Sequence, residues 1–197
     1  MRCDWQNGVP AVNFNLMHVI FETKSLVARK LKSSDFPAFH EMQADDEVMR
    51  YTTGSGLDRT ENERQLRMCI DSYSRKDNQF WVWAVVRKSD QEFIGTCAVV
   101  PSEERPEIGY RMLRKWFRNG YGQEICDALL HYGIHKLELR EIIAFADVRN
   151  LASIKILDRS VLTFVEQVVN DEGYHDRFYQ WKFGDRHLVT STPEEVD

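Results

Sequence analysis

The spacing of apolar residues along the chain predicts where its strands lie. Strand-like apolar runs occupy residues 26–31, 80–86, 92–100, 107–113, 141–146, 161–169 and 174–183. Residues 80–86 are almost continuously apolar, which is typical of a strand covered on both faces. Residues 170–173 have the composition of a tight turn, so the last two runs are predicted to form a hairpin.

Other segments have the period of a helix. After Thr60 and Glu63, whose spacing is that of a capping box, apolar residues recur on one helical face at Leu66, Cys69, Ile70 and Tyr73. An earlier helix is predicted from residue 33, where residues 33–35 supply N-cap chemistry and Pro37 falls in the first turn. A third helix begins near Asn119, and a short fourth helix covers residues 150–159.

The predicted order of elements is β-α-α-β-β-β-α-β-α-β-β. Hairpin-spaced strands in the first half meet a β-α-β crossover in the second half, so the fold class is α/β with a mixed (α+β) sheet and helices on both faces. Residues 26–184 are expected to form one domain. Residues 1–25 show no sustained period and are expected to be an extension, while residues 185–197 form an acidic tail.

Composition excludes several classes of protein. A formal net charge of −5 and a pI near 5.7 argue against nucleic-acid binding and fit a basic partner such as an amine. The four cysteines are scattered, and His131 and His135 have no evident third ligand, so no metal site is expected. The chain shows neither a signal peptide nor an apolar run of about 18 residues, so we expect a cytoplasmic protein without a membrane segment.

Residues 107–122 carry the strongest chemical signal. A strand-like run ends in a basic, aromatic loop, which closes on Gly120-Tyr121-Gly122 directly before a helix. Backbone N–H groups and the positive end of the helix dipole converge at such a turn and favour an anion, which indicates a ligand that carries phosphate. The loop also holds three cations, Arg114, Lys115 and Arg118.

Two common phosphate-binding motifs do not fit this turn. The P-loop pattern Gly-x-x-x-x-Gly-Lys-Ser/Thr is absent. A dinucleotide fingerprint needs a third glycine where Ile125 stands, and it would lie in the first βα unit rather than after several strands.

The segment instead resembles the acyl-CoA-binding motif of the GNAT acetyltransferases, Arg/Gln-x-x-Gly-x-Gly/Ala, which reads here as residues 117–122. The order of predicted elements is similar to the GNAT fold over residues 26–183. Residues 147–153, with Asn150 and Ser153, look like the Asn-x-x-Ser signature of the branch that includes ribosomal-protein N-terminal acetyltransferases of the RimJ/RimL type. Residues 44–51 and 107–110 resemble that branch too. The chain departs from the pattern at Phe117, where many members have Arg or Gln, and at residues 160–162.

The resemblance implies acetyl-CoA as co-substrate. The implied cradle for its phosphates consists of Phe117, Arg118, Asn119, Gly120, Tyr121 and Gly122. The backbone of Tyr110, Arg111 and Met112 would pair with the pantetheine arm, and an N–H of this strand would polarise the thioester carbonyl. Asn150 would hold the pantetheine, although a helix N-cap is an equally good reading of this residue.

The resemblance also implies a base for the amine and a proton for the departing thiolate. Glu107 is the candidate base, acting directly or through water, and an ordinary solvated glutamate is its alternative. Ser153 is the candidate proton donor, with local capping as its alternative. Tyr110, Tyr174 and Tyr179 are further candidate acids, which the sequence does not rank.

The implied function is an acetyl-CoA-dependent N-acetyltransferase in which a primary amine attacks the thioester directly in a ternary complex. By analogy with the branch, the favoured acceptor is a protein N-terminus. A small amine or an antibiotic is the next alternative, and a non-catalytic acyl-CoA-binding regulatory module is the rival from another class. Formation of a homodimer is a further alternative, in which residues 1–25 would be a contact surface.

Overall fold

The computed structural model describes residues 19–184, so most of the predicted extension and the acidic tail lie outside the described residues. The strands are β1 (Val19–Glu22), β2 (Leu26–Lys30), β3 (Trp81–Arg87), β4 (Phe93–Ser102), β5 (Arg105–Met112), β6 (Glu141–Asp147), β7 (Thr163–Val169) and β8 (His175–Lys182). The α-helices are α1 (Phe36–Gln43), α2 (Asp46–Met49), α3 (Arg59–Ser72), α4 (Tyr121–His135) and α5 (Leu151–Leu157).

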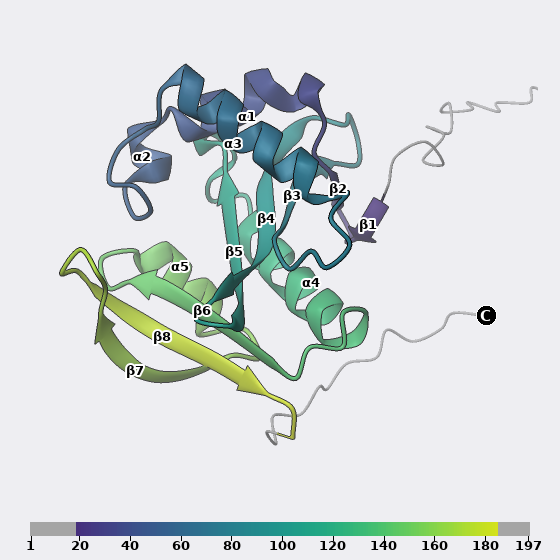
Figure 1. Cartoon of the computed structure of the whole chain (residues 1–197). Helices are drawn as coiled ribbons and strands as arrows, with labels where there is room; N and C mark the ends of the chain where they lie inside the picture. Colours follow the sequence, from purple (N-terminus) through teal and green to yellow (C-terminus); the bar gives the residue numbers. More distant parts are fainter. Residues whose placement is uncertain (1–18, 185–197) are drawn as a thin grey trace, which may run out of the picture.

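The strands form one mixed sheet of eight strands in the order β1-β2-β3-β4-β5-β6-β8-β7. Only β5 and β6 are parallel neighbours, because α4 crosses over the sheet between them, and every other pair within residues 19–184 is antiparallel. The predicted mixed sheet is therefore confirmed. Figure 1 shows α1, α2 and α3 gathered at one end of the central strands, with α4 running behind them.

Helices cover both faces of the sheet, as predicted. The two faces follow from the alternation of side chains along each strand, which places Trp83 and Ala84 of β3 in different hydrophobic clusters. The cluster around Trp83 includes Ile125 and Leu129 of α4, whereas the cluster around Ala84 includes Met42 of α1. The central strands are therefore buried from both sides, which explains the continuous apolar run of β3.

Two elements were not predicted from the sequence. β1 lies in the segment expected to be an extension, and it pairs antiparallel with β2, for example Val19 with Arg29. α2 is a single turn, in which the Asp45 carboxylate accepts a hydrogen bond from the Glu47 N–H at 2.9 Å. Elements of four residues are too short to show a period, so sheet pairing and capping decide them.

The predicted start of α3 was wrong by two residues. The N-cap is Asp58, whose carboxylate accepts a hydrogen bond from the Glu61 N–H at 2.8 Å, and Thr60 lies inside the helix. Both residues are good caps, and the sequence alone does not choose between them. α4 likewise begins at Tyr121, with Gly120 rather than Asn119 before its first turn.

Candidate active site

The sheet opens between β5 and β6. These strands pair only where Glu107 meets Ile143, because β5 then follows β4 as far as Met112 while β6 follows β8 to Asp147 (Figure 1). The Leu113 N–H donates to the Ile94 carbonyl on β4, so the alternate residues Tyr110 and Met112 turn their backbone polar groups toward the opening. The edge that the sequence assigned to pantetheine pairing is thus open to a ligand.

The turn between β5 and α4 presents a row of unpaired amides. Gly120 has φ 82° and Arg118 has φ 63°, both in the left-handed region. Within residues 19–184, the backbone N–H groups of residues 118–123 have no hydrogen-bond acceptor. The first backbone N–H of α4 with an acceptor is that of Glu124, which donates to the Gly120 carbonyl at 3.3 Å. Such a row at a helix N-terminus fits the pyrophosphate of a nucleotide-like cofactor.

Gly122 also has a packing role. A Cβ at this position would lie 2.8 Å from Ile156 Cδ1 and 3.2 Å from Met112 Cε. The first turn of α4 is therefore pressed between β5 and α5, which fixes the free amides beside the opening of the sheet.

The predicted cradle residues divide into two groups. Phe117, Arg118, Gly120 and Gly122 line the cleft. The Asn119 side chain instead donates to the Phe117 carbonyl at 3.1 Å, and the Tyr121 ring packs against Trp116 at a centroid distance of 6.2 Å. Asn119 and Tyr121 can therefore contribute their backbone N–H, whereas their side chains shape the loop.

The cations of the loop are unequal. Arg114 pairs with Asp45 at 3.0 Å, and Lys115 pairs with Glu92 at 2.8 Å. Arg118 has no acidic partner among the residues that the structure describes. Its guanidinium is consequently the positive charge of the loop that is available to a bound phosphate.

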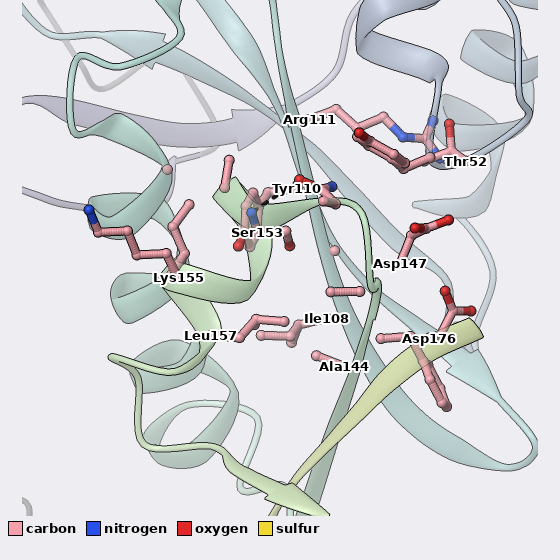
Figure 2. A pocket seen from close by; sticks show the side chains of 18 of the residues that line it. Thr52, Ile108, Tyr110, Arg111, Ala144, Asp147, Ser153, Lys155, Leu157 and Asp176 are labelled. Carbon is pink, nitrogen blue, oxygen red and sulfur yellow. Dashed lines mark hydrogen bonds between the residues drawn. The ribbon is translucent and has the colours of Figure 1, made fainter. Parts of the chain in front are cut away.

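The two faces of β5 carry different chemistry. Glu107, Gly109 and Arg111 share one face, whereas Tyr110 and Met112 lie on the other face among residues that pack with α4 and α5. Figure 2 shows Arg111, Thr52, Asp147 and Asp176 on one side of the strand, with Ser153, Lys155 and Leu157 on the other. The cleft thus has two sides that meet at β5.

Glu107 lies where β5 and β6 part, with properties suited to a base. Burial raises the pKa of its carboxyl, the Ser102 side chain opposes this, and the negative charge of Asp176 raises the pKa further. A raised pKa makes the carboxylate a stronger proton acceptor. The predicted site residue therefore lines the cleft in an environment that increases its basicity.

Ser153 and Asn150 lie on the opposite side, at the start of α5. The side-chain Oδ1 of Asn150 accepts a hydrogen bond from the Ser153 N–H at 3.1 Å, so the N-cap reading of Asn150 is correct. The Ser153 side chain lies near Tyr110 and acts to lower its pKa, although burial has the larger effect and raises it. The buried Tyr110 hydroxyl has no hydrogen-bond partner within residues 19–184.

The structure separates the candidate tyrosines. The Tyr179 hydroxyl donates to Asp158 at 2.7 Å, and the exposed Tyr174 ring lies 4.6 Å from the Arg149 guanidinium. Tyr110 is the one of these three whose hydroxyl lies close to Ser153. It is therefore the best placed alternative proton donor.

Several residues of the cleft were missed from the sequence. Asp147 and Asp176 face each other across the β6–β8 pair, and Arg149 forms a hydrogen-bonded ion pair with Asp147 that lowers the pKa of this carboxyl. Asp147 and Arg149 lie just before Asn150 in the sequence, which was a usable signal. Asp176 comes from the final hairpin, so only strand pairing brings it to the site.

The described part of the chain contains neither a metal-binding group nor a membrane-spanning helix. No group of three or more His, Cys, Asp or Glu side chains within residues 19–184 could hold a metal ion. None of the helices in that range combines the length and the hydropathy that crossing a bilayer requires.

The open pair of parallel strands, together with the unpaired amides at the following helix, fits the extended pantetheine arm and the phosphates of an acyl-CoA. The family model described as acetyltransferase (GNAT) domain matches residues 25–160, and this chain belongs to that family. It is thus a GNAT N-acetyltransferase, whose fold binds acetyl-CoA.

A curated relative is the uncharacterized N-acetyltransferase YoaA of Bacillus subtilis (strain 168), 30% identical over 146 residues that cover 72% of this chain and 81% of the relative. A solved acetyltransferase from Salmonella typhimurium, described as modifying the N-terminal serine of ribosomal protein L7/L12, has a TM-score of 0.69 at 18% identity, covering 83% of this chain and 98% of its own. RimL, an L7/L12 α-N-protein acetyltransferase solved with coenzyme A, has a TM-score of 0.69 at 17% identity, covering 83% and 97%. These two structures support the fold.

Proposed function

We propose that this N-acetyltransferase transfers the acetyl group of acetyl-CoA to the N-terminal amine of a protein. One observation carries the donor half of the proposal: the unpaired amides of residues 118–123 adjoin the open edge of β5. The acceptor half is supported by the RimL-type structures, which share the fold, and by the open cleft on the other side of β5.

For the donor, we assign the phosphates to the amides of residues 118–123 and to the Arg118 guanidinium. The backbone of Tyr110 and Met112 would hold the pantetheine amides as a neighbouring strand would, and the carboxamide of Asn150 would contact the same arm. Acetyl-CoA supplies an acetyl group on a thioester, whose carbonyl an N–H of β5 would polarise.

In the proposed reaction, the neutral amine attacks the thioester carbonyl, a C–N bond forms and the C–S bond breaks. Glu107 accepts the proton that the amine loses, directly or through one water. Ser153, or Tyr110 beside it, gives a proton to the departing thiolate. Glu107 and Ser153 lie on opposite sides of β5, so the amine and the leaving group are handled by separate residues.

Mass spectrometry tests the function. The protein is incubated with acetyl-CoA and a panel of peptides with different N-terminal residues, and with polyamines as small-molecule acceptors. The proposal predicts that peptides gain one acetyl group on the α-amine. Acetylation of polyamines alone would replace it with a small-amine function.

The rival from another class is a regulatory module that binds acetyl-CoA without turning it over. A thermal-shift measurement with acetyl-CoA, ATP and NAD identifies the bound ligand, because a ligand that binds the folded state raises its melting temperature. If acetyl-CoA raises the melting temperature and no amine of the panel is acetylated, the rival replaces our proposal.

A further inference from the structure

Arg111 is a cation whose environment the donor site does not explain. It lies on β5, is partly buried and lines the cleft. Its Nη1 donates to the side-chain Oε1 of Gln43 at 2.7 Å, and the structure gives its guanidinium no other hydrogen bond within residues 19–184. No acidic side chain in that range pairs with it.

The groups behind Arg111 are neutral. The side-chain amide of Gln43 donates to the side-chain oxygens of Asn62 at 3.2 Å and Gln65 at 3.0 Å. The side-chain amide of Asn62 donates in turn to the Leu57 backbone carbonyl at 2.9 Å. This network holds the guanidinium in position but supplies no negative charge. Burial lowers the pKa of Arg111. A desolvated cation without a counter-ion is unfavourable, so a negative ligand group would be bound strongly there.

The phosphates of the donor are on the wrong side to be this ligand. Met112, the next residue, turns toward Gly122 and the cradle. Successive residues of a strand point to opposite faces, so Arg111 points away from the cradle. Figure 2 agrees, since the Arg111 side chain extends toward Thr52 and away from Ser153 and Lys155.

We infer that Arg111 binds a carboxylate that the acceptor carries close to its reacting amine. Glu107 and Arg111 lie on the same face of β5 with only Gly109 between them on that face. A Cβ at Gly109 would meet nothing within 4 Å, so the floor between the two charges is open. An acceptor that lies across Gly109 meets an acid at one end and a guanidinium at the other.

The strand sets the spacing of the two groups on the acceptor. Glu107 and Arg111 are four residues apart, about 13 Å along an extended strand. Their side chains and a bridging water take up part of this length. An acidic side chain at the second or third residue of a peptide therefore fits better than one farther along, since each extended residue adds about 3.4 Å.

This inference rests on the proposed function and deepens it, and its test uses matched acceptors. Initial rates are measured for hexapeptides that begin with Ser and carry Glu or Gln at the second or third position. A second pair, glycylglycine and glycylglycinamide, asks the same question without a protein N-terminus. The wild-type protein is expected to prefer Glu over Gln by about tenfold or more in kcat/KM at one of the two positions, as for a hydrogen bond to a charged group.

Arg111→Gln should bring this preference close to one, and Arg111→Lys should retain part of it. The control is Arg105→Gln, which removes an arginine from the same strand and the same cleft. Arg105 already pairs with Glu103 at 2.9 Å and lies 5.2 Å from the Phe178 ring, so its loss should leave the preference intact. The preference is a ratio within one enzyme, so a general loss of activity does not change it.

Each outcome decides the matter. Equal rates for Glu and Gln peptides in the wild-type protein, or a preference that persists in Arg111→Gln, would overturn the inference while leaving N-terminal acetylation standing. If no peptide is used but glycylglycine is preferred to its amide, the protein-acceptor proposal fails and the role of Arg111 stands. If neither set is acetylated, both are overturned. Should Arg111→Gln not fold, the wild-type comparison of the matched acceptors still decides.

Discussion

Replacing Glu107 with Gln tests the assignment of the base. Glu107 and Tyr110 are three residues apart on β5, about 10 Å along the strand. A glutamate side chain spans only part of this distance, so a base at this position reaches an amine near Tyr110 through a water. General-base catalysis contributes about 10²- to 10⁴-fold, and transfer through water favours the lower end. We therefore expect kcat to fall about a hundredfold, or about 2.7 kcal/mol.

The pH dependence makes the test specific. A base acts when it is deprotonated, so activity is present above its pKa and is lost as the pH falls through it. Burial raises the pKa of Glu107 above its ordinary 4.5, so the fall occurs at a higher pH than for a solvated glutamate. A profile of kcat against pH with one peptide should show this fall in the wild-type protein and not in Glu107→Gln. The amine is the same in both, so its own titration cancels.

The same substitution predicts the sign of a stability change. A carboxyl whose pKa is raised by folding weakens the fold at pH values above that pKa, because the charged form is disfavoured there. Glu107→Gln should therefore unfold at equal or higher urea concentration at neutral pH, despite its low activity. The control is Glu103→Gln, an exposed residue of the preceding turn that also lines the cleft. Full activity in Glu107→Gln, with an unchanged pH profile, would refute the assignment.

Three further predictions concern other parts of the molecule. Ser153→Ala should lower kcat by about a hundredfold in the acetyl-transfer assay. Tyr110→Phe should not lower the melting temperature, because the hydroxyl that it removes is buried without a hydrogen-bond partner among the described residues. A Tyr110→Phe variant that is less stable would contradict this. Gly95→Ala should lower the free energy of urea unfolding by about 1–3 kcal/mol, because its Cβ would lie 2.0 Å from the Arg111 carbonyl oxygen. Gly109→Ala should leave this free energy unchanged and raise the KM for the acceptor, because a Cβ there would project into open space. Asp35→Asn should lower the free energy of unfolding by about 3–5 kcal/mol, because Asp35 is buried and binds both Nη atoms of Arg29 at 2.7 Å. As a control, Glu63→Gln breaks an exposed ion pair with Arg59 and should lower it by less than about 1 kcal/mol.

Local sequence was sufficient to predict the longer elements and the glycine turn before α4. The apolar run of β3, the helical period after Leu66 and the turn at Gly120 each encode their structure within a few residues, so all three predictions were confirmed. The sequence predicts an anion site for the same reason, since a glycine turn and the helix after it are consecutive in the chain. Short elements such as β1 carry too few residues for a period, and pairing with β2 decides them.

The residues on the acceptor side of the cleft are brought together only by the tertiary structure, so the sequence did not predict them as a group. Asp176 reaches the site because β8 pairs with β6, and Gln43 reaches Arg111 from a helix 68 residues earlier in the chain. The sequence by itself determined the order of the longer elements and the family resemblance, and it predicts a site for acetyl-CoA at residues 117–122. Only the tertiary structure decided that β5 and β6 separate, and that Glu107 and Arg111 lie at the two ends of an open floor at Gly109. It also decided their surroundings, because Asp176 lies near Glu107, whereas Arg111 contacts the uncharged side-chain amide of Gln43. The physical reason is that burial and the pairing of charges depend on neighbours distant in the chain, which the sequence near each residue does not record.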